Sequence, residues 1–131
     1  MIALDTNVLV RFLVEDEKAQ TAAAARLIGR TVAAGETLFV SDIVLCETVW
    51  VLAGSYRVAR SIIATTLREL LRARHLVFSA PDQLSRALDA YSKGKGDFAD
   101  YLIREHARTA GCAGVETFDR ALLAEPGFAA P

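Results

Sequence analysis

Residues 1–13 read MIALDTNVLVRFL, and one acidic residue interrupts a pattern that is otherwise typical of a protein core. The apolar segment 1–5 is too short for a helix and predicts a short buried strand. From Asn7 onward the apolar residues recur at helical spacing and predict a helix. Asp5 therefore ends the strand. A carboxylate in such a place is costly unless it is protonated, paired with a cation or bound to a metal ion.

The rest of the chain repeats this alternation of short apolar runs and helical patterns. Because short strands are separated by helices, the sequence predicts an α/β sandwich with a central parallel sheet. The C-terminal GFAAP reads as a loose tail. The further strands are expected at 37–41, 75–79 and 112–117, and the further helices at 17–34, 43–54 (capped by Asp42), 58–74, 82–93 (after Pro81) and 98–111.

Composition fits one domain, 1–131, with a hydrophobic core, because 53% of its residues are apolar. The net charge is −1, so any polyanionic partner must be held by local arginines or through a metal ion. No uninterrupted apolar run approaches the ~20 residues that span a bilayer. We therefore expect a cytoplasmic protein without a membrane segment, with Cys46 and Cys112 as small buried residues.

Acidic residues from separate elements are expected at one edge of the sheet. The carboxyl ends of parallel strands meet at one edge, and both Asp5 and Asp119 follow strands. Glu47 stands in an otherwise apolar helix, on or beside its buried side, although it could equally face water at the rim. Asp97 and Asp100 are three residues apart and share one helix face, although acids at that place also serve as helix caps.

Gathered carboxylates raise one another's pKa, and a divalent cation relieves that repulsion. Oxygen ligands without a set of Cys or His residues favour Mg²⁺, with Mn²⁺ as the alternative. Such an ion can activate water and stabilise charge on phosphate oxygens. The acids therefore indicate a site that cleaves phosphodiesters.

Four segments carry a resemblance to a known family. They are IALDTNVLVRFL at 2–13, SDIVLCETVWVL at 41–52, GDFADYLIREHARTAGC at 96–112 and ETFDRAL at 116–122. In this order and spacing they resemble the PIN-domain ribonucleases, most closely the VapC-type toxins of toxin–antitoxin pairs. The resemblance implies a three-layer α/β/α sandwich and metal-dependent cleavage of cellular RNA. It also implies an antitoxin partner whose C-terminal segment covers the site, and a homodimer.

The resemblance also implies which acids hold the metal ion. Asp5, Glu47 and Asp119 match the first, second and fourth acids of the family. Asp100 fits the frame of the third acid, and Asp97 is an additional ligand or an acid that holds a water molecule.

Neighbouring polar residues are candidates for supporting roles. Hydroxyl and amide groups beside a carboxylate can orient it or hold a metal-bound water. Thr6 and Asn7 have such places after Asp5, although either could simply cap a helix. Thr117 has one before Asp119, although it could be an ordinary strand threonine.

Basic residues close to these acids in the sequence are candidates for binding RNA phosphates. They are Arg11, Lys93, Lys95 and Arg120, and ordinary surface charge is the alternative for each. Arg104 stands where the family commonly has alanine. We expect it to pair with Asp100, four residues earlier, or to touch a substrate phosphate.

Two other kinds of function remain open. In a phosphohydrolase of the haloacid-dehalogenase type, an aspartate after the first strand is the nucleophile, but an acid is then needed where this chain has Asn7. A PIN-like module could bind RNA or a partner without cleaving. A phosphoacceptor receiver domain would need a strand-end aspartate near the middle of the chain, and none is found.

Overall fold

The computed structural model describes residues 1–131, which form two compact units, Met1–Ser79 and Ala80–Pro131. Each unit is described by itself, and the expectation of a single domain stays a prediction. No helix is both long and apolar enough to cross a membrane. Along the chain the elements are β1 Ile2–Ala3, α1 Thr6–Val14, α2 Lys18–Ala33, β2 Leu38–Phe39, α3 Asp42–Gly54, α4 Arg60–Arg72, β3 Leu76–Val77, α5 Pro81–Lys93, α6 Phe98–Thr109, β4 Val115–Glu116 and β5 Phe128–Ala129.

The first unit contains the three-stranded sheet that the apolar runs predict. Its strand order is β1-β2-β3 and both pairings are parallel, with Leu38 of β2 facing Ile2 on one side and Leu76 on the other. The strands are only two residues long, so the regular pairing is shorter than the apolar runs. Leu4 is buried, but Ile2 is 54% exposed, so β1 is not the fully buried strand that was expected.

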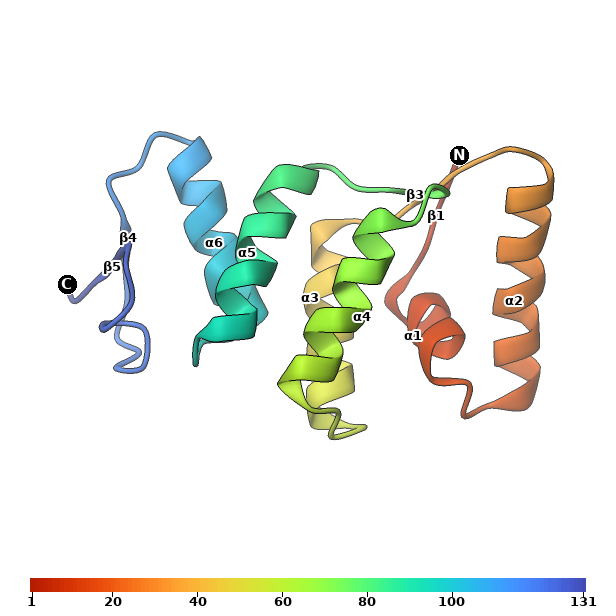
Figure 1. Ribbon diagram of the computed structural model, residues 1–131, viewed down its shortest axis with the longest axis horizontal. Coiled ribbons are helices and arrows are strands. Elements are labelled where there is room, and N and C mark those ends of the chain that lie inside the picture. The colour runs from red at the N-terminus through yellow and green to blue at the C-terminus, as the bar shows by residue number, and fades with distance from the viewer. The chain divides into compact units, whose positions relative to one another are not determined.

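The helices of the first unit pack on one another and bury the apolar faces that their sequences predict. Helix α1 contacts both α2 and α3, and α3 contacts α4, which lies beside it in Figure 1. The core residues shared by these elements and the sheet include Leu9, Val10, Leu38, Val40, Leu45, Val49, Ile63 and Leu67.

Two expectations about α3 and the cysteines are wrong. The N-cap of α3 is Ser41, not Asp42, because the Ser41 hydroxyl accepts a hydrogen bond from the Val44 N–H at 3.2 Å. Asp42 instead lies in the first turn, where its charge suits the helix dipole. Cys112 is exposed and Cys46 is partly buried, so neither is a fully buried core residue.

The second unit is built on α5 and α6, which lie side by side in Figure 1 and contact each other along their length. Pro81 begins α5, as predicted. The rings of Tyr91 and Phe98 meet edge to face, with their centroids 6.1 Å apart. Both side chains are buried, so the aromatic pair ties the two helices together near the turn that joins them.

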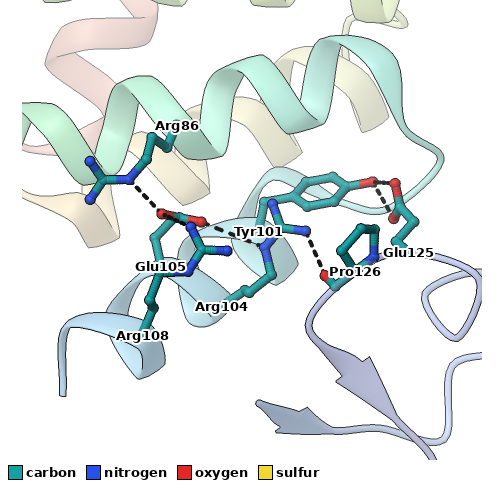
Figure 2. Close-up of polar contacts among 7 residues, drawn as sticks. All are labelled: Arg86, Tyr101, Arg104, Glu105, Arg108, Glu125 and Pro126. Atoms are coloured by element: carbon teal, nitrogen blue, oxygen red, sulfur yellow. Dashed lines mark hydrogen bonds and ion pairs between the residues drawn. The ribbon is translucent and has the colours of Figure 1, made fainter. Parts of the chain in front are cut away.

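A buried glutamate joins the same two helices through charge. Glu105 on α6 is only 1% exposed, and its carboxylate lies 2.7 Å from the Arg86 Nε on α5 (Figure 2). Arg104 and Arg108 approach the same carboxylate at 3.5 and 3.4 Å. We call these four residues the Glu105 cluster. A buried carboxylate is tolerated only with such partners, so the cluster fixes how α5 and α6 pack.

The end of the chain is not the loose tail that was expected. Phe128 and Ala129 form β5, which pairs in parallel with β4, and Phe128 is 9% exposed. The expected fourth strand therefore exists as β4, but it pairs with β5 in a two-stranded sheet. Pairing with β4 and burial of one aromatic ring order this short segment.

Candidate active site

Asp5 follows β1 and occupies the N-cap position of α1. Its backbone is extended there, with φ −79° and ψ 159°, but its carboxylate makes no capping hydrogen bond. Its side chain is exposed. The capping role therefore does not account for this carboxylate.

Glu47 is linked to the residue that follows Asp5. The Thr6 hydroxyl, which is almost completely buried, donates a hydrogen bond to the Glu47 carboxylate at 3.2 Å. Glu47 itself is exposed, so it points out of the apolar helix α3 and does not line its buried side. The first unit thus brings Glu47 next to the start of α1, where Asp5 is located.

Arg11, a candidate for RNA binding, is already engaged within the first unit. Its Nε donates to Gln20 at 2.6 Å, and its Nη1 lies 3.1 Å from the Tyr56 hydroxyl and 3.4 Å from Asp16. The Tyr56 hydroxyl donates to Asp16, and this hydrogen bond raises the pKa of Tyr56. Arg11 therefore joins α1 to α2 and to the loops that contain Asp16 and Tyr56. Asn7, by contrast, is exposed and lines a cavity with Arg11 and Gln20.

In the second unit, Asp97 and Asp100 form a capping box at the start of α6. The Asp97 carboxylate accepts from the Phe98 N–H at 2.8 Å, and the Asp100 carboxylate accepts from the Asp97 N–H at 2.9 Å. The interpretation of Asp97 as an N-cap is therefore confirmed. Capping leaves other lone pairs on each carboxylate available, because an ionised carboxyl group has about four acceptor positions.

The surroundings of Asp100 raise the pKa of its carboxyl group. Burial raises its pKa above the ordinary value, a backbone hydrogen bond from Asp97 lowers it, and the negative charges of Asp97, Asp119 and Glu125 raise it further. These charges come from the N-cap of α6, from the loop after β4 and from the segment before β5. The neighbouring acids thus disfavour the charge of Asp100, and two of them, Asp97 and Asp119, are among the acids that the sequence predicts to gather.

Asp119 is held in a tight turn after β4. Its N–H donates to the Thr117 hydroxyl at 3.0 Å, and its carboxylate accepts from the Ala121 N–H at 2.9 Å. Thr117 thus contacts the backbone of Asp119 and shapes the turn. The carboxylate of Asp119 is exposed beyond this turn.

The other basic candidates differ in their surroundings. Arg104 does not pair with Asp100, because its guanidinium donates to the Pro126 carbonyl at 2.9 Å and pairs with Glu105 (Figure 2). Lys93, Lys95 and Arg120 are exposed. Their exposure lets a phosphate reach these three side chains, whereas Arg104 is part of the fold.

Sequence reasoning missed two residues, Tyr101 and Glu125. Neither residue belongs to the acids, polar neighbours or basic residues that the sequence pattern singles out. A signal was available, because the hydroxyl of a buried tyrosine almost always needs a hydrogen-bond partner. The structure provides that partner in Glu125.

The donor set suits a hard cation, although neither unit gathers three Asp, Glu, His or Cys side chains closely enough to enclose one. The candidates are all carboxylates, which are ligands that Mg²⁺ and Mn²⁺ prefer. The charges that raise the pKa of Asp100 are also those that a cation would neutralise. The donor chemistry therefore fits such an ion, which one or two of Asp97, Asp100 and Asp119 would hold in the second unit, with water completing its shell.

Comparison with known proteins covers nearly the whole chain. The model of the PIN domain family matches residues 2–128. A VapC ribonuclease of Aquifex aeolicus (strain VF5) is 31% identical over 121 residues, which are 92% of this chain and 88% of that protein.

Proposed function

The chain belongs to the PIN domain family, and from this membership we propose that it is a metal-dependent endoribonuclease, the toxin of a toxin–antitoxin pair. The similarity to a VapC ribonuclease supports the nuclease activity. The observation that carries the proposal is the contact between Asp97 and Asp100 at the start of α6, where burial and neighbouring negative charges raise the pKa of Asp100. An RNA substrate, an antitoxin whose C-terminal segment covers the site, a homodimer and a cytoplasmic location belong to the same proposal.

In the proposed mechanism Asp5, Glu47, Asp97, Asp100 and Asp119 are the residues that would bind Mg²⁺ or Mn²⁺. When bound, such an ion would supply Lewis acidity toward the phosphate and a nucleophilic water at neutral pH. The chain itself supplies the charge and orientation of its carboxylates. Thr6 orients Glu47 through its hydroxyl, the Thr117 hydroxyl shapes the turn of Asp119, and Asn7 holds a water molecule. Arg11, Arg104, Arg120, Lys93 and Lys95 were the candidates for phosphate contacts, and the exposed Arg120, Lys93 and Lys95 are kept for that role.

The direct test is cleavage of total RNA. We expect cleavage with Mg²⁺ or Mn²⁺ and none after EDTA is added. The Asp5→Asn variant should cleave on the order of 100-fold more slowly or worse, because a metal site supplies several kcal/mol of transition-state stabilisation. Glu36→Gln, which removes one charge from an exposed turn, is the matched control and should cleave normally.

Several outcomes would contradict this function. Cleavage in EDTA, or undiminished cleavage by Asp5→Asn, would exclude the metal-dependent mechanism. Covalent phosphate on Asp5 would indicate a phosphohydrolase. RNA binding without cleavage would indicate a binding module.

A smaller effect is expected at Thr6. In Thr6→Val the methyl group replaces the hydroxyl that donates to Glu47, so Glu47 loses its orienting partner. We expect cleavage to fall about tenfold, as for other groups that orient metal ligands. Stability should fall by only about 1 kcal/mol, since one hydrogen bond to an exposed acceptor is lost.

Thr66→Val is the matched control for this prediction, because the Thr66 hydroxyl bonds only to the backbone carbonyl of Ile62 in α4. Its cleavage rate should equal that of the wild type. Equal rates for Thr6→Val and Thr66→Val in single-turnover assays would show that Thr6 does not orient Glu47.

A further inference from the structure

Tyr101 and Glu125 join α6 to the segment that follows β4. The Tyr101 ring is fully buried, and its hydroxyl lies 2.7 and 2.5 Å from the two carboxylate oxygens of Glu125 (Figure 2). The same hydroxyl accepts a hydrogen bond from the Gly96 N–H at 2.9 Å. A hydrogen bond to a carboxylate is among the stronger kinds in proteins, so this pair holds Glu125 firmly.

The turn before α6 is shaped to fit over this pair. A Cβ atom at Gly94 would overlap both the Tyr101 hydroxyl and the Glu125 carboxylate. A Cβ atom at Gly96 would lie 2.6 Å from the Leu122 Cδ2, which is too close for any real contact. The turn, Tyr101 and the segment after Asp119 therefore pack without room for another side chain.

Arg104 holds the residues directly after Glu125. Its guanidinium lies over the rings of Tyr101 and Phe128, 5.2 and 5.6 Å from their centroids, and donates to the Pro126 carbonyl. Such cation–π contacts and the hydrogen bond add to the attachment of this segment to α6. Figure 2 shows Tyr101 and Arg104 reaching from one helix to Glu125 and Pro126.

The position of Glu125 is transmitted to Asp119 through the backbone. The Glu125 N–H donates to the Leu122 carbonyl at 2.9 Å, and the Leu122 N–H donates to the Asp119 carbonyl at 3.0 Å. These two turns connect the acids through six peptide bonds without an extended stretch. Glu125 also acts directly on Asp100 through its charge.

We propose that Glu125, held by Tyr101, is a positioning residue of the metal site: it fixes the Asp119 turn beside α6 and adds negative charge that strengthens cation binding. This inference rests on the proposed function. Glu125 therefore works in two separable ways, through the hydrogen bond and through its charge.

Two substitutions separate these contributions. Tyr101→Phe removes the hydrogen bond and keeps the ring and the charge of Glu125. Glu125→Gln keeps an oxygen that can accept the hydrogen bond and removes the charge. We expect each variant to bind Mn²⁺ about tenfold more weakly in an electron paramagnetic resonance titration, the usual effect of losing an outer partner of a metal site. Because the residues act together, the double variant should lose less than the product of the two effects.

Hydrogen exchange provides a readout of position that does not depend on cleavage. In Tyr101→Phe we expect faster exchange of the Ala121, Leu122 and Glu125 amides. The amides of Leu88 and Leu102, in the helical core, should keep their protection. Glu36→Gln, with the same change in net charge as Glu125→Gln, should match the wild type in both measurements.

The outcomes distinguish this inference from the proposed function. If the wild type binds Mn²⁺ and cleaves RNA while both variants bind Mn²⁺ as the wild type does, the inference alone is wrong. Faster exchange with unchanged Mn²⁺ affinity would also overturn it, since Tyr101 and Glu125 would then be merely structural. If the variants lose Mn²⁺ affinity as expected but the wild type cleaves no RNA, the ribonuclease proposal alone is wrong. A wild type that binds no Mn²⁺ overturns both.

Discussion

We expect the Asp100→Asn variant to lose RNA cleavage by on the order of 100-fold or more and yet to resist unfolding slightly better than the wild type in metal-free buffer. The loss follows from the proposed role of Asp100 as a metal ligand. The gain follows from its surroundings, because burial and three neighbouring acids disfavour its charge. Asn keeps an oxygen that can accept the hydrogen bond from the Asp97 N–H, so the capping box persists. The helix dipole opposes the gain by only about 0.3–1 kcal/mol.

The stability gain should depend on pH in a defined direction. The pKa of Asp100 in the folded protein is raised above its ordinary value of 3.8. Such a carboxyl group favours the folded state when protonated, and this contribution is lost as the pH rises from below 3.8 through the folded-state pKa. The advantage of Asp100→Asn should therefore be absent at lower pH, grow across that interval and then stay constant to neutral pH.

Urea unfolding with EDTA at several pH values, together with a cleavage assay, measures both effects. Asp82→Asn is the matched control, because Asp82 is exposed and lies in the first turn of α5. Loss of the Asp82 charge should lower the free energy of unfolding by about 0.3–1 kcal/mol, because only its interaction with the helix dipole is removed. If Asp100→Asn is destabilised as much as Asp82→Asn at neutral pH, the repulsion among the acids is not significant in solution.

The Glu105→Ala variant should be destabilised by about 3–5 kcal/mol, the cost of removing one partner from a buried ion pair. The substitution takes the carboxylate away from Arg86 and leaves Arg104, whose side chain is only 12% exposed, without its counter-charge. It also leaves a cavity between α5 and α6. The midpoint of urea unfolding measures the loss.

Glu105→Gln keeps the shape of the side chain and removes its charge, so it should cost less than Glu105→Ala. Glu116→Ala removes an exposed acid of the same unit and should change stability by less than about 0.5 kcal/mol. A stability of Glu105→Ala within about 1 kcal/mol of that of the wild type is the effect of an ordinary substitution. It would mean that the Glu105 cluster does not hold these helices together.

Much of the fold could be predicted because its signals are local. Family membership confirms the expected three-layer α/β/α class, and each expected helix is present within a few residues of its predicted ends. Apolar runs located the first three strands. The strand β5 was missed because only its pairing with β4 orders it, and a two-residue strand has no pattern of its own.

The site prediction lacked the partners of Arg104 and Tyr101, because these contacts join residues that are distant in sequence. The capping role of Asp97 was predictable from its place before α6, whereas the partner of Arg104 was not. Arg104 is one turn from Asp100, yet its guanidinium contacts Pro126 and Glu105 instead. The bond between Tyr101 and Glu125 spans 24 residues, and helical spacing carries no information about it.

The two glycines before α6 restrict how this turn can change during evolution. Gly94 and Gly96 have no space for a methyl group, whereas Lys93 and Lys95 are exposed on either side of Gly94. Natural variation can therefore adjust the charge of the turn only at the lysine positions. Substitutions at positions 93 and 95 can therefore change the affinity of this turn for a polyanion. Substitutions at positions 94 and 96 would displace the Tyr101–Glu125 hydrogen bond.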